Sequence, residues 1–257
     1  MKYLILTGDD FGRSSAVNEA IERQHQAGLL TQASLMVNEP GAEEAVRIAR
    51  RNPGLCVGLH LTLCHGRAAE RSGITNAAGR FIDSPAMAGL RYALDPRSRT
   101  PLQREIEAQF AKFRALGFGG SQLDGHTHLH LHPTIFRLTR TALARYGFRL
   151  VRLVRTARDR SPLGLIFRGL SALADRELAP LGVRAADQVE GLRNTGRMTT
   201  ACMLATIGQL PEGVTELYNH PGAEPEPLDF PRLREAIAAR EIVLVSAFTL
   251  PPPQTAA

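Results

Sequence analysis

Short apolar runs alternate along this chain with longer segments in which apolar residues recur every three or four positions. The short runs predict strands at 3–8, 33–38, 56–63, 121–126, 150–155, 188–192, 215–219 and 242–248. The longer segments predict helices at 14–27, 42–51, 102–116, 134–146, 165–178, 199–209 and 232–239. Because strand–helix units repeat, we expect a parallel sheet within an α/β fold, an irregular (β/α) barrel of seven or eight units.

The pattern predicts a single domain over 1–250, with two interruptions and a disordered tail at 251–257. The first interruption, 64–101, is rich in Gly, Pro and Arg, and a loop of that length is typical of a lid or substrate-binding segment. The second, 158–180, is apolar and basic, so it either packs on the barrel or faces a membrane as an amphipathic helix. Its arginines are Arg160, Arg168 and Arg176.

Polar residues stand near the ends of the predicted strands. The carboxyl ends of strands in a (β/α) barrel form the rim where active sites lie. The needs of folding alone do not explain why residues capable of catalysis or metal binding stand at nearly every rim position. These residues are Asp9, Asp10, Asn38, His60, His126, Arg152, Arg155 and His220.

The segment 124–133, with sequence DGHTHLHLHP, carries four histidines at alternate positions beside an aspartate. On an extended strand, a period of two would place all four imidazoles on one face. Imidazole is a common metal ligand and a common general acid or base. The alternative is a chance cluster in a polar loop, or an adventitious metal site.

Two adjacent carboxylates, Asp9 and Asp10, end the first predicted strand. Neighbouring residues on a strand point to opposite sides, so we expect different roles, one carboxylate binding metal and the other handling protons. The alternative is an ordinary turn, since Ser14 and Ser15 can begin the following helix. His60 and the histidine segment favour the metal interpretation.

Composition narrows the class of protein. The net charge of +6 fits either scattered surface arginines or attraction to anionic lipid, whereas 5% aromatic residues and no Trp argue against nucleic-acid binding. No apolar run reaches the roughly 20 residues that span a bilayer. The N-terminus lacks a signal-peptide layout, and three cysteines without a CxxC pair argue against a disulfide framework. We therefore expect a cytoplasmic protein.

One aspartate and two histidines form a facial metal site with open positions for water and substrate. A nearby second carboxylate could accept the water proton, and a further histidine could protonate the leaving group, which describes hydrolysis of an amide or ester. A metal-dependent phosphoesterase is an alternative. The only lysines are Lys2 and Lys112, which argues against a bimetallic site built on a carbamylated lysine. A sugar- or lipid-binding module would not need Asp9.

The chain resembles the YdjC-like carbohydrate deacetylases at four motifs, which occur in order at 9–12 (DDFG), 58–61 (GLHL), 124–126 (DGH) and 220–222 (HPG). The resemblance implies a deacetylase-type barrel with one divalent cation, Mg²⁺ or Zn²⁺. It implies that Asp10, His60 and His126 are the metal ligands, that Asp9 is the catalytic base and that His220 is the acid.

Within that family the chain is similar to the hopanoid-biosynthesis-associated branch, through 18–21, 33–37, 102–113 and 151–153. This implies removal of acetyl from an N-acetylglucosamine unit on a glycosylated hopanoid, with peripheral contact at the inner membrane face. A soluble chito-oligosaccharide is the alternative substrate, and a homodimer is left open. His25 and His65 are interpreted as bystanders, and Arg152 either binds substrate or forms an ion pair. The candidate substrate-binding residues are Asn38, Asp124, His128, His130 and Arg152.

Overall fold

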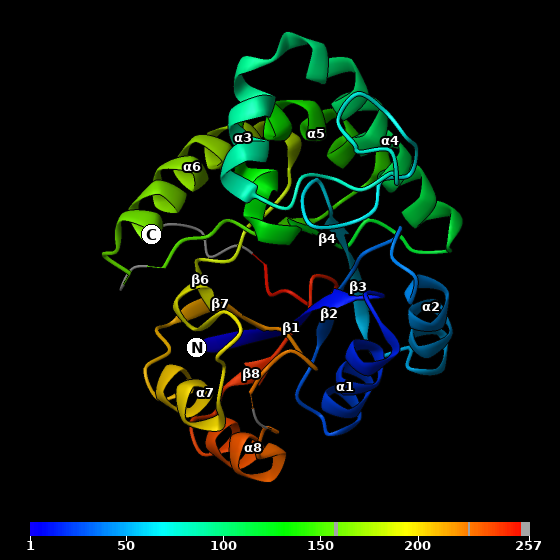
Figure 1. Cartoon of the computed structure of the whole chain (residues 1–257). Coiled ribbons are helices and arrows are strands. Elements are labelled where there is room, and N and C mark those ends of the chain that lie inside the picture. The colour runs from blue at the N-terminus through cyan, green and yellow to red at the C-terminus, as the bar shows by residue number, and fades with distance from the viewer. Residues whose placement is uncertain (157–158, 226, 253–257) are drawn as a thin grey trace.

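The computed structural model describes residues 1–156, 159–225 and 227–252, and within them the strands form one parallel sheet (Figure 1). The order along the sheet is β5-β4-β3-β2-β1-β7-β6, and β8 pairs with β1. This confirms the predicted α/β fold with an irregular barrel-like sheet. The strands are β1 (Lys2–Phe11), β2 (Gln32–Leu35), β3 (Cys56–Leu61), β4 (Gln122–Gly125), β5 (Leu150–Val151), β6 (Gln188–Glu190), β7 (Gly213–Asn219) and β8 (Val243–Leu244).

Strand β1 lies at the centre of the sheet and organises it. Strand β7 runs along one edge of β1 from Lys2 to Gly8. The other edge is shared, since β8 pairs with Tyr3 and Leu4 while β2 pairs with the second half of β1. Strands β5 and β8 are shorter than predicted, because only two residues of each pair with a neighbouring strand.

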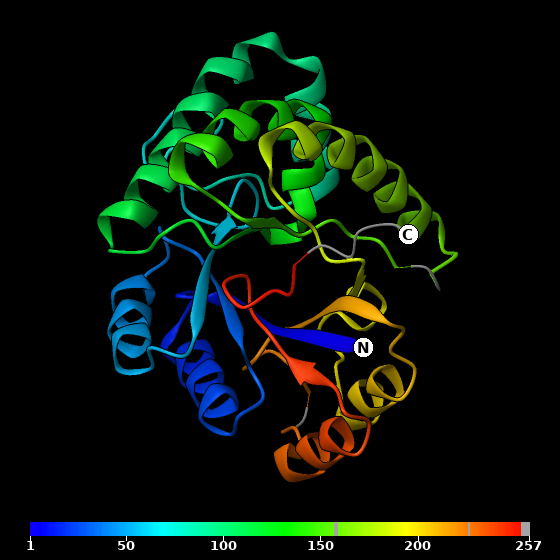
Figure 2. The same ribbon diagram turned by 180° about the vertical axis from the view of Figure 1, so that it is seen from behind.

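Helices surround the curled sheet. Figures 1 and 2 show α1, α2, α7 and α8 in the lower half of the molecule and α3, α4, α5 and α6 in the upper half. The helices are α1 (Ser15–Gln26), α2 (Ala42–Arg51), α3 (Pro85–Leu94), α4 (Arg99–Ala115), α5 (Pro133–Tyr146), α6 (Pro162–Leu178), α7 (Thr200–Ile207) and α8 (Phe230–Ala238). Short 3₁₀ turns are η1 (Pro96–Ser98), η2 (His126–Leu131), η3 (Ala179–Leu181) and η4 (Leu192–Asn194).

Local signals in the sequence explain these helices. Helix α4 buries Ile106, Phe110 and Phe113 on the apolar face that its spacing predicted. Ser14 caps α1 by accepting a hydrogen bond from the backbone of Val17, and Gly147 ends α5 in the left-handed conformation. Seven of the helices were predicted to within a few residues.

The two interruptions are more ordered than expected. The segment 64–101 is not one long loop, because it contains α3, which begins at Pro85 after the N-cap Ser84. The segment 158–180 contains α6, which packs on the core through Ala174 and Leu178. The predicted tail at 251–257 falls mostly on residues 253–257, which lie outside the described residues. No helix among the described residues is both long and apolar enough to cross a bilayer.

Candidate metal centre

At the end of β1, the side chains of Asp9 and Asp10 both point into one buried pocket. Asp10 has a left-handed backbone (φ 65°), and the pairing of β1 with β2 shifts register between Gly8 and Phe11. This bulge breaks the strand alternation that would have sent the two side chains to opposite faces. The expectation of opposite faces is therefore wrong, although Asp9 and Asp10 do have different partners. A left-handed non-glycine residue costs about 1 kcal/mol or more, and such strain is typical of functional sites.

Three potential ligand atoms converge at Asp10. Asp10 Oδ1 lies 2.9 Å from His126 Nδ1 and 3.3 Å from His60 Nε2. Asp10 Oδ1 and His60 Nε2 are buried and make no hydrogen bond with acceptable geometry. Buried polar atoms are rarely left unsatisfied, so their lone pairs aimed at a common point fit a bound cation. This donor set of one carboxylate and two imidazoles suits Zn²⁺ or a related divalent metal.

The charges in this pocket favour a cation. Burial would raise the pKa of Asp10, but the neighbouring His126 and His60 hold that pKa well below its usual value. Burial would lower the pKa of His60, yet Asp124 and Asp10 raise it to about 10. A proton on His60 thus compensates the carboxylates, and a bound metal would take its place.

Asp124 orients one of the ligands. The Nδ1–H of His60 donates to Asp124 Oδ1 over 2.8 Å, which leaves His60 Nε2 directed at Asp10. The other carboxylate oxygen accepts a hydrogen bond of 2.6 Å from Ser34. A carboxylate behind a metal-binding histidine fixes its ring and tautomer. Asp124 is fully buried, so its contacts favour orientation of His60, and its substrate-binding role stays a prediction.

Asp9 is held by a buried arginine. Arg152 donates to the two oxygens of Asp9 over 2.7 and 2.8 Å, in a bidentate pair. It also contacts Glu216 at 2.8 Å and Asp124 at 2.8 Å, and its guanidinium lies over the ring of Tyr218. Since Arg152 is 0% exposed, its contacts favour the ion-pair role of the two alternatives, and its substrate-binding role stays a prediction.

The histidine segment is not a strand. Strand β4 ends at Gly125 and the chain enters η2, with left-handed backbone at Thr127 and His128. The four imidazoles therefore do not share one face, and the predicted ladder is wrong. His126 faces Asp10, whereas His128 lies 3.0 Å from the hydroxyl of Tyr218 and His130 donates to the carbonyl of Arg152.

Burial also determines the charge of His128 and His130. It lowers the pKa of His128 well below the usual value and that of His130 to about 4, so both are neutral at pH 7. His130 is 0% exposed, which favours a structural role, and its substrate-binding role stays a prediction. The substrate-binding role of His128 stays a prediction.

Two further candidates lie at different distances from the cluster. His220 follows β7 and is half-buried, with Nε2 4.0 Å from Asp9 Oδ2, so it faces the pocket. Its acid role stays a prediction. Asn38 lies in the turn after β2 and contacts Glu105 and Lys112 of α4, not the carboxylate–histidine cluster.

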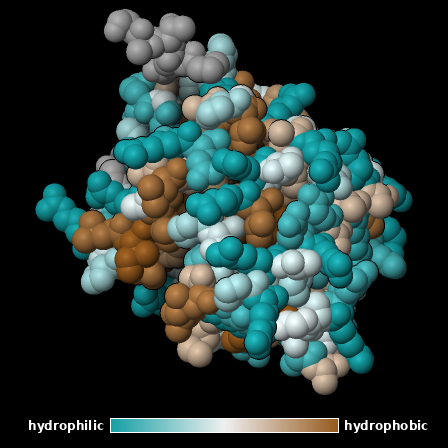
Figure 3. Space-filling model, turned by 90° about the horizontal axis from the view of Figure 1, so that it is seen from above, coloured by the Kyte–Doolittle hydropathy of each residue, from teal (hydrophilic) through white to brown (hydrophobic). Residues whose placement is uncertain are grey.

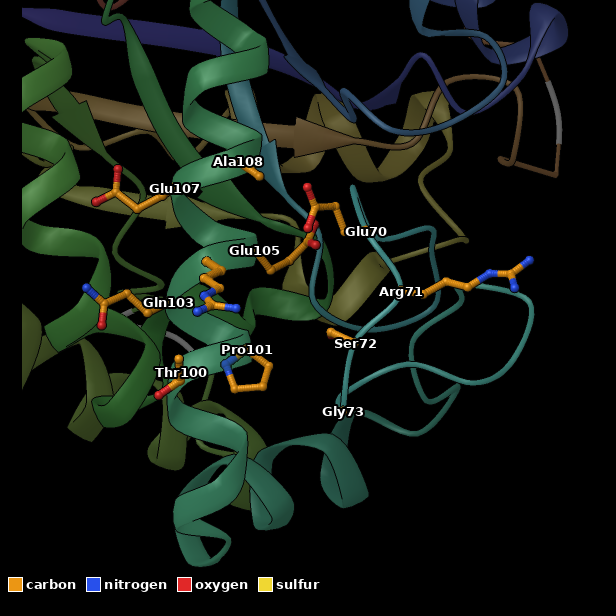
Figure 4. A pocket seen from close by; sticks show the side chains of 11 residues that line it. Glu70, Arg71, Ser72, Gly73, Thr100, Pro101, Gln103, Glu105, Glu107 and Ala108 are labelled. Atoms are coloured by element: carbon orange, nitrogen blue, oxygen red, sulfur yellow. The ribbon is translucent and has the colours of Figure 1, made fainter.

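An open hollow of about 740 Å³ separates α4 from the chain around Glu70 (Figure 4). At its inner side Glu105 accepts hydrogen bonds from the backbone of Ala69 over 2.9 and 3.0 Å. Burial raises the pKa of Glu105. No histidine of the metal centre lines this hollow. Through these hydrogen bonds, Glu105 connects the segment after β3 to α4.

Several residues of the site were missed from sequence. Glu216 and Gln122 belong to the buried polar network, because Glu216 accepts from Gln122 over 2.8 Å. Their signal was a polar side chain inside a predicted strand. The ring of His65, which was interpreted as a bystander, lies edge-on to that of His126 with 6.2 Å between the ring centroids.

Comparison with known proteins gives consistent matches. Residues 3–244 match the profile of a family described as YdjC-like protein. The chain is 38% identical over 159 residues to a carbohydrate deacetylase of Geobacillus stearothermophilus, covering 61% of this chain and 62% of that protein. It is 31% identical over 244 residues to a mouse carbohydrate deacetylase, covering 85% and 77%. A chitooligosaccharide deacetylase of Serratia marcescens is 33% identical over 169 residues, covering 64% of each.

Solved structures share the fold. A protein from Enterococcus faecalis, described as a putative cellobiose-phosphate cleavage protein, superposes with a TM-score of 0.73 at 22% identity, covering 96% of this chain and 98% of that one. A lactam utilization protein from Thermus thermophilus gives 0.52 at 14% identity, covering 96% and 100%. At these identities the likeness concerns the fold.

Proposed function

Because the chain belongs to the YdjC-like family, we propose that it is a metal-dependent carbohydrate N-deacetylase. The observation that carries the proposal is the convergence of Asp10, His60 and His126, in which Asp10 Oδ1 and His60 Nε2 lack hydrogen-bond partners. Asp9 is held beside them by Arg152. The two carboxylates have separate partners, as a ligand and a base require. A binding module would have no use for the arginine-held Asp9.

The residues around the pocket have distinct roles in amide hydrolysis. A divalent cation on Asp10, His60 and His126 would polarise the acetyl carbonyl and make water acidic near neutral pH. Asp9 accepts the proton of the attacking water, and Arg152 fixes both of its oxygens so that the carboxylate keeps one orientation. His220, which faces Asp9, donates a proton to the departing amine.

We propose an N-acetylglucosamine unit as the substrate, which the names of the carbohydrate and chitooligosaccharide deacetylase relatives support. We further propose that this sugar is carried by a hopanoid or similar lipid and is processed at the inner face of the membrane. The resemblance at 18–21, 33–37, 102–113 and 151–153 and the net charge of +6 support this choice. The rival is a soluble chito-oligosaccharide.

The test measures acetate release from free N-acetylglucosamine, chitobiose and an N-acetylglucosaminyl lipid, with and without a chelator. We expect release that the chelator abolishes and that Zn²⁺ or Mg²⁺ restores. No acetate from any amino sugar, or release that survives full metal removal, would contradict the proposal. Phosphate release from sugar phosphates instead would favour the phosphoesterase alternative.

The same panel tests the lipid. We expect kcat/KM to be higher for the glycolipid than for chitobiose. Equal or faster turnover of chitobiose would contradict the lipid-linked substrate but not the deacetylase activity.

A further inference from the structure

Two helices of the upper half carry apolar stripes that face away from the core. On α3 the stripe is Met87, Leu90 and Leu94, which are 57%, 54% and 71% exposed at three- and four-residue spacing. Helix α6 also exposes apolar side chains. Its exposed apolar side chains are Leu163, Leu165, Ile166 and Leu173, at 53–58%.

This concentration is unusual for a water-facing surface. Among the described residues, seven of the ten large hydrophobic side chains that are exposed belong to α3 and α6. Figure 3, which looks down on the upper half, shows hydrophobic side chains gathered on one side of that face. We call these seven side chains the α3/α6 surface. Contiguous apolar patches on soluble proteins typically mark a protein or membrane contact.

The charges around the α3/α6 surface indicate which partner it fits. Arg160, Arg168 and Arg176 are exposed, and none makes an ion pair within the part of the chain that the structure describes. The acidic residues of α6 are already neutralised, since Asp175 pairs with Arg155 and Glu177 pairs with Arg140. Unpaired arginines beside apolar side chains complement an anionic lipid surface, which offers phosphates above and hydrocarbon below.

Helix α3 also combines apolar side chains with basic ones. An open hollow of about 780 Å³ lies along it, lined by the apolar stripe, by Arg91 and Arg97, and by Asp95, which pairs with Arg91 at 4.0 Å. Its Met87, Leu90 and Leu94 can therefore enter an interface while arginines stay at headgroup level.

The helices that carry the α3/α6 surface lie next to the metal centre. Both helices pack against η2, the turn that begins with the candidate ligand His126. From α6, the ring of Phe167 lies 5.3 Å from that of His128. A sugar whose lipid stays in the bilayer needs such proximity, because its headgroup cannot travel far from the interface.

We propose that the α3/α6 surface docks the protein on an anionic membrane. This inference deepens the proposed function. It rests on that function because a lipid-linked sugar substrate is the reason for the protein to dock on a membrane. The contact is peripheral, with the stripes of both helices entering the headgroup boundary and the arginines binding lipid phosphates.

The test is co-sedimentation of the full chain with phosphatidylcholine vesicles, with and without phosphatidylglycerol, at low and high salt. We expect binding to phosphatidylglycerol vesicles that weakens as salt rises. Leu163→Ser with Ile166→Ser should lower the partition coefficient at least about tenfold. Arg168→Glu should lower it about fivefold or more.

Matched controls lie away from the α3/α6 surface. Phe248→Ser removes a side chain that is 49% exposed, and Arg50→Glu makes the same charge change on α2. Both should bind vesicles like the wild type. All variants should keep chitobiose deacetylation and a wild-type melting temperature, so a failure of docking is distinct from a failure of the proposed enzyme.

Three results would overturn the proposal. The first is no vesicle binding by the wild type at low salt. The second is unchanged binding by the α6 variants, with the controls behaving alike. The third is a concentration-dependent dimer that the Leu163→Ser, Ile166→Ser variant loses, in the absence of vesicle binding, which would assign the surface to a second copy of the chain.

Discussion

Arg152 is the cation on which three buried carboxylates depend, so its removal should be costly in a specific way. Its guanidinium contacts Asp9, Asp124 and Glu216 at 2.7–2.8 Å, and all four side chains are at most 2% exposed. Replacing Arg152 by Met preserves much of the volume but leaves the three carboxylates without their shared partner.

The expected cost follows from that burial. Breaking a buried ion pair by removing one partner typically costs about 3–5 kcal/mol, because the remaining charge stays desolvated. A domain is stable by only about 5–15 kcal/mol. We therefore expect Arg152→Met to fold under native conditions, with its urea midpoint lowered by roughly 1 M or more.

A second substitution separates charge from packing. Glu216→Gln alone removes one partner of Arg152 and should be destabilising. In the Arg152→Met background it removes a charge that has lost its partner, so it should be neutral or stabilising. The coupling between the two substitutions should be at least about 1 kcal/mol. The control is Arg145→Met, whose surface pair with Glu107 leaves the arginine 60% exposed and should be worth about 1 kcal/mol or less.

The assay is equilibrium urea unfolding followed by far-ultraviolet circular dichroism, with chelator present so that metal binding does not contribute. Strictly additive effects of Arg152→Met and Glu216→Gln would refute the electrostatic account. A loss no larger than that of Arg145→Met would show that burial does not make this network costly to break.

Three further predictions concern the cluster and its surroundings. Asp10→Ala, His60→Ala or His126→Ala should each lower metal occupancy in elemental analysis, and full occupancy in either histidine variant would exclude this ligand set. Asp9→Asn should keep metal and fold but lose at least about two orders of magnitude in kcat, whereas retained activity would assign the base elsewhere. The buried His130, with a pKa of about 4, gives stability that is full above its unfolded pKa of about 6.5 and is lost as the pH falls toward 4. His130→Gln should therefore lose less stability than the wild type between pH 7.5 and 5, by about 2 kcal/mol, and an unchanged slope in urea unfolding would show that His130 is not responsible.

The sequence by itself determined the order of the elements and the residue types of the site. Strand and helix periodicities are local, so the parallel α/β architecture could be predicted from neighbouring residues. Local signals such as Ser14 and Gly147 marked helix ends for the same reason. Asp10, His60 and His126 could be named as ligands because the motifs that contain them resemble those of a known family, and each stands near the end of a strand, where a barrel places its chemistry.

Only the tertiary structure decided where the side chains point and which charges meet. The left-handed backbone at Asp10 and His128 depends on packing around the bulge and η2, and no periodicity encodes it. Arg152 meets Asp9 from 143 residues away, so its ion-pair role emerges only when β1 and the chain after β5 come together. The apolar residues of α6 were compatible with packing on the barrel and with exposure. A helix can be apolar on two sides, and the core covers only one of them.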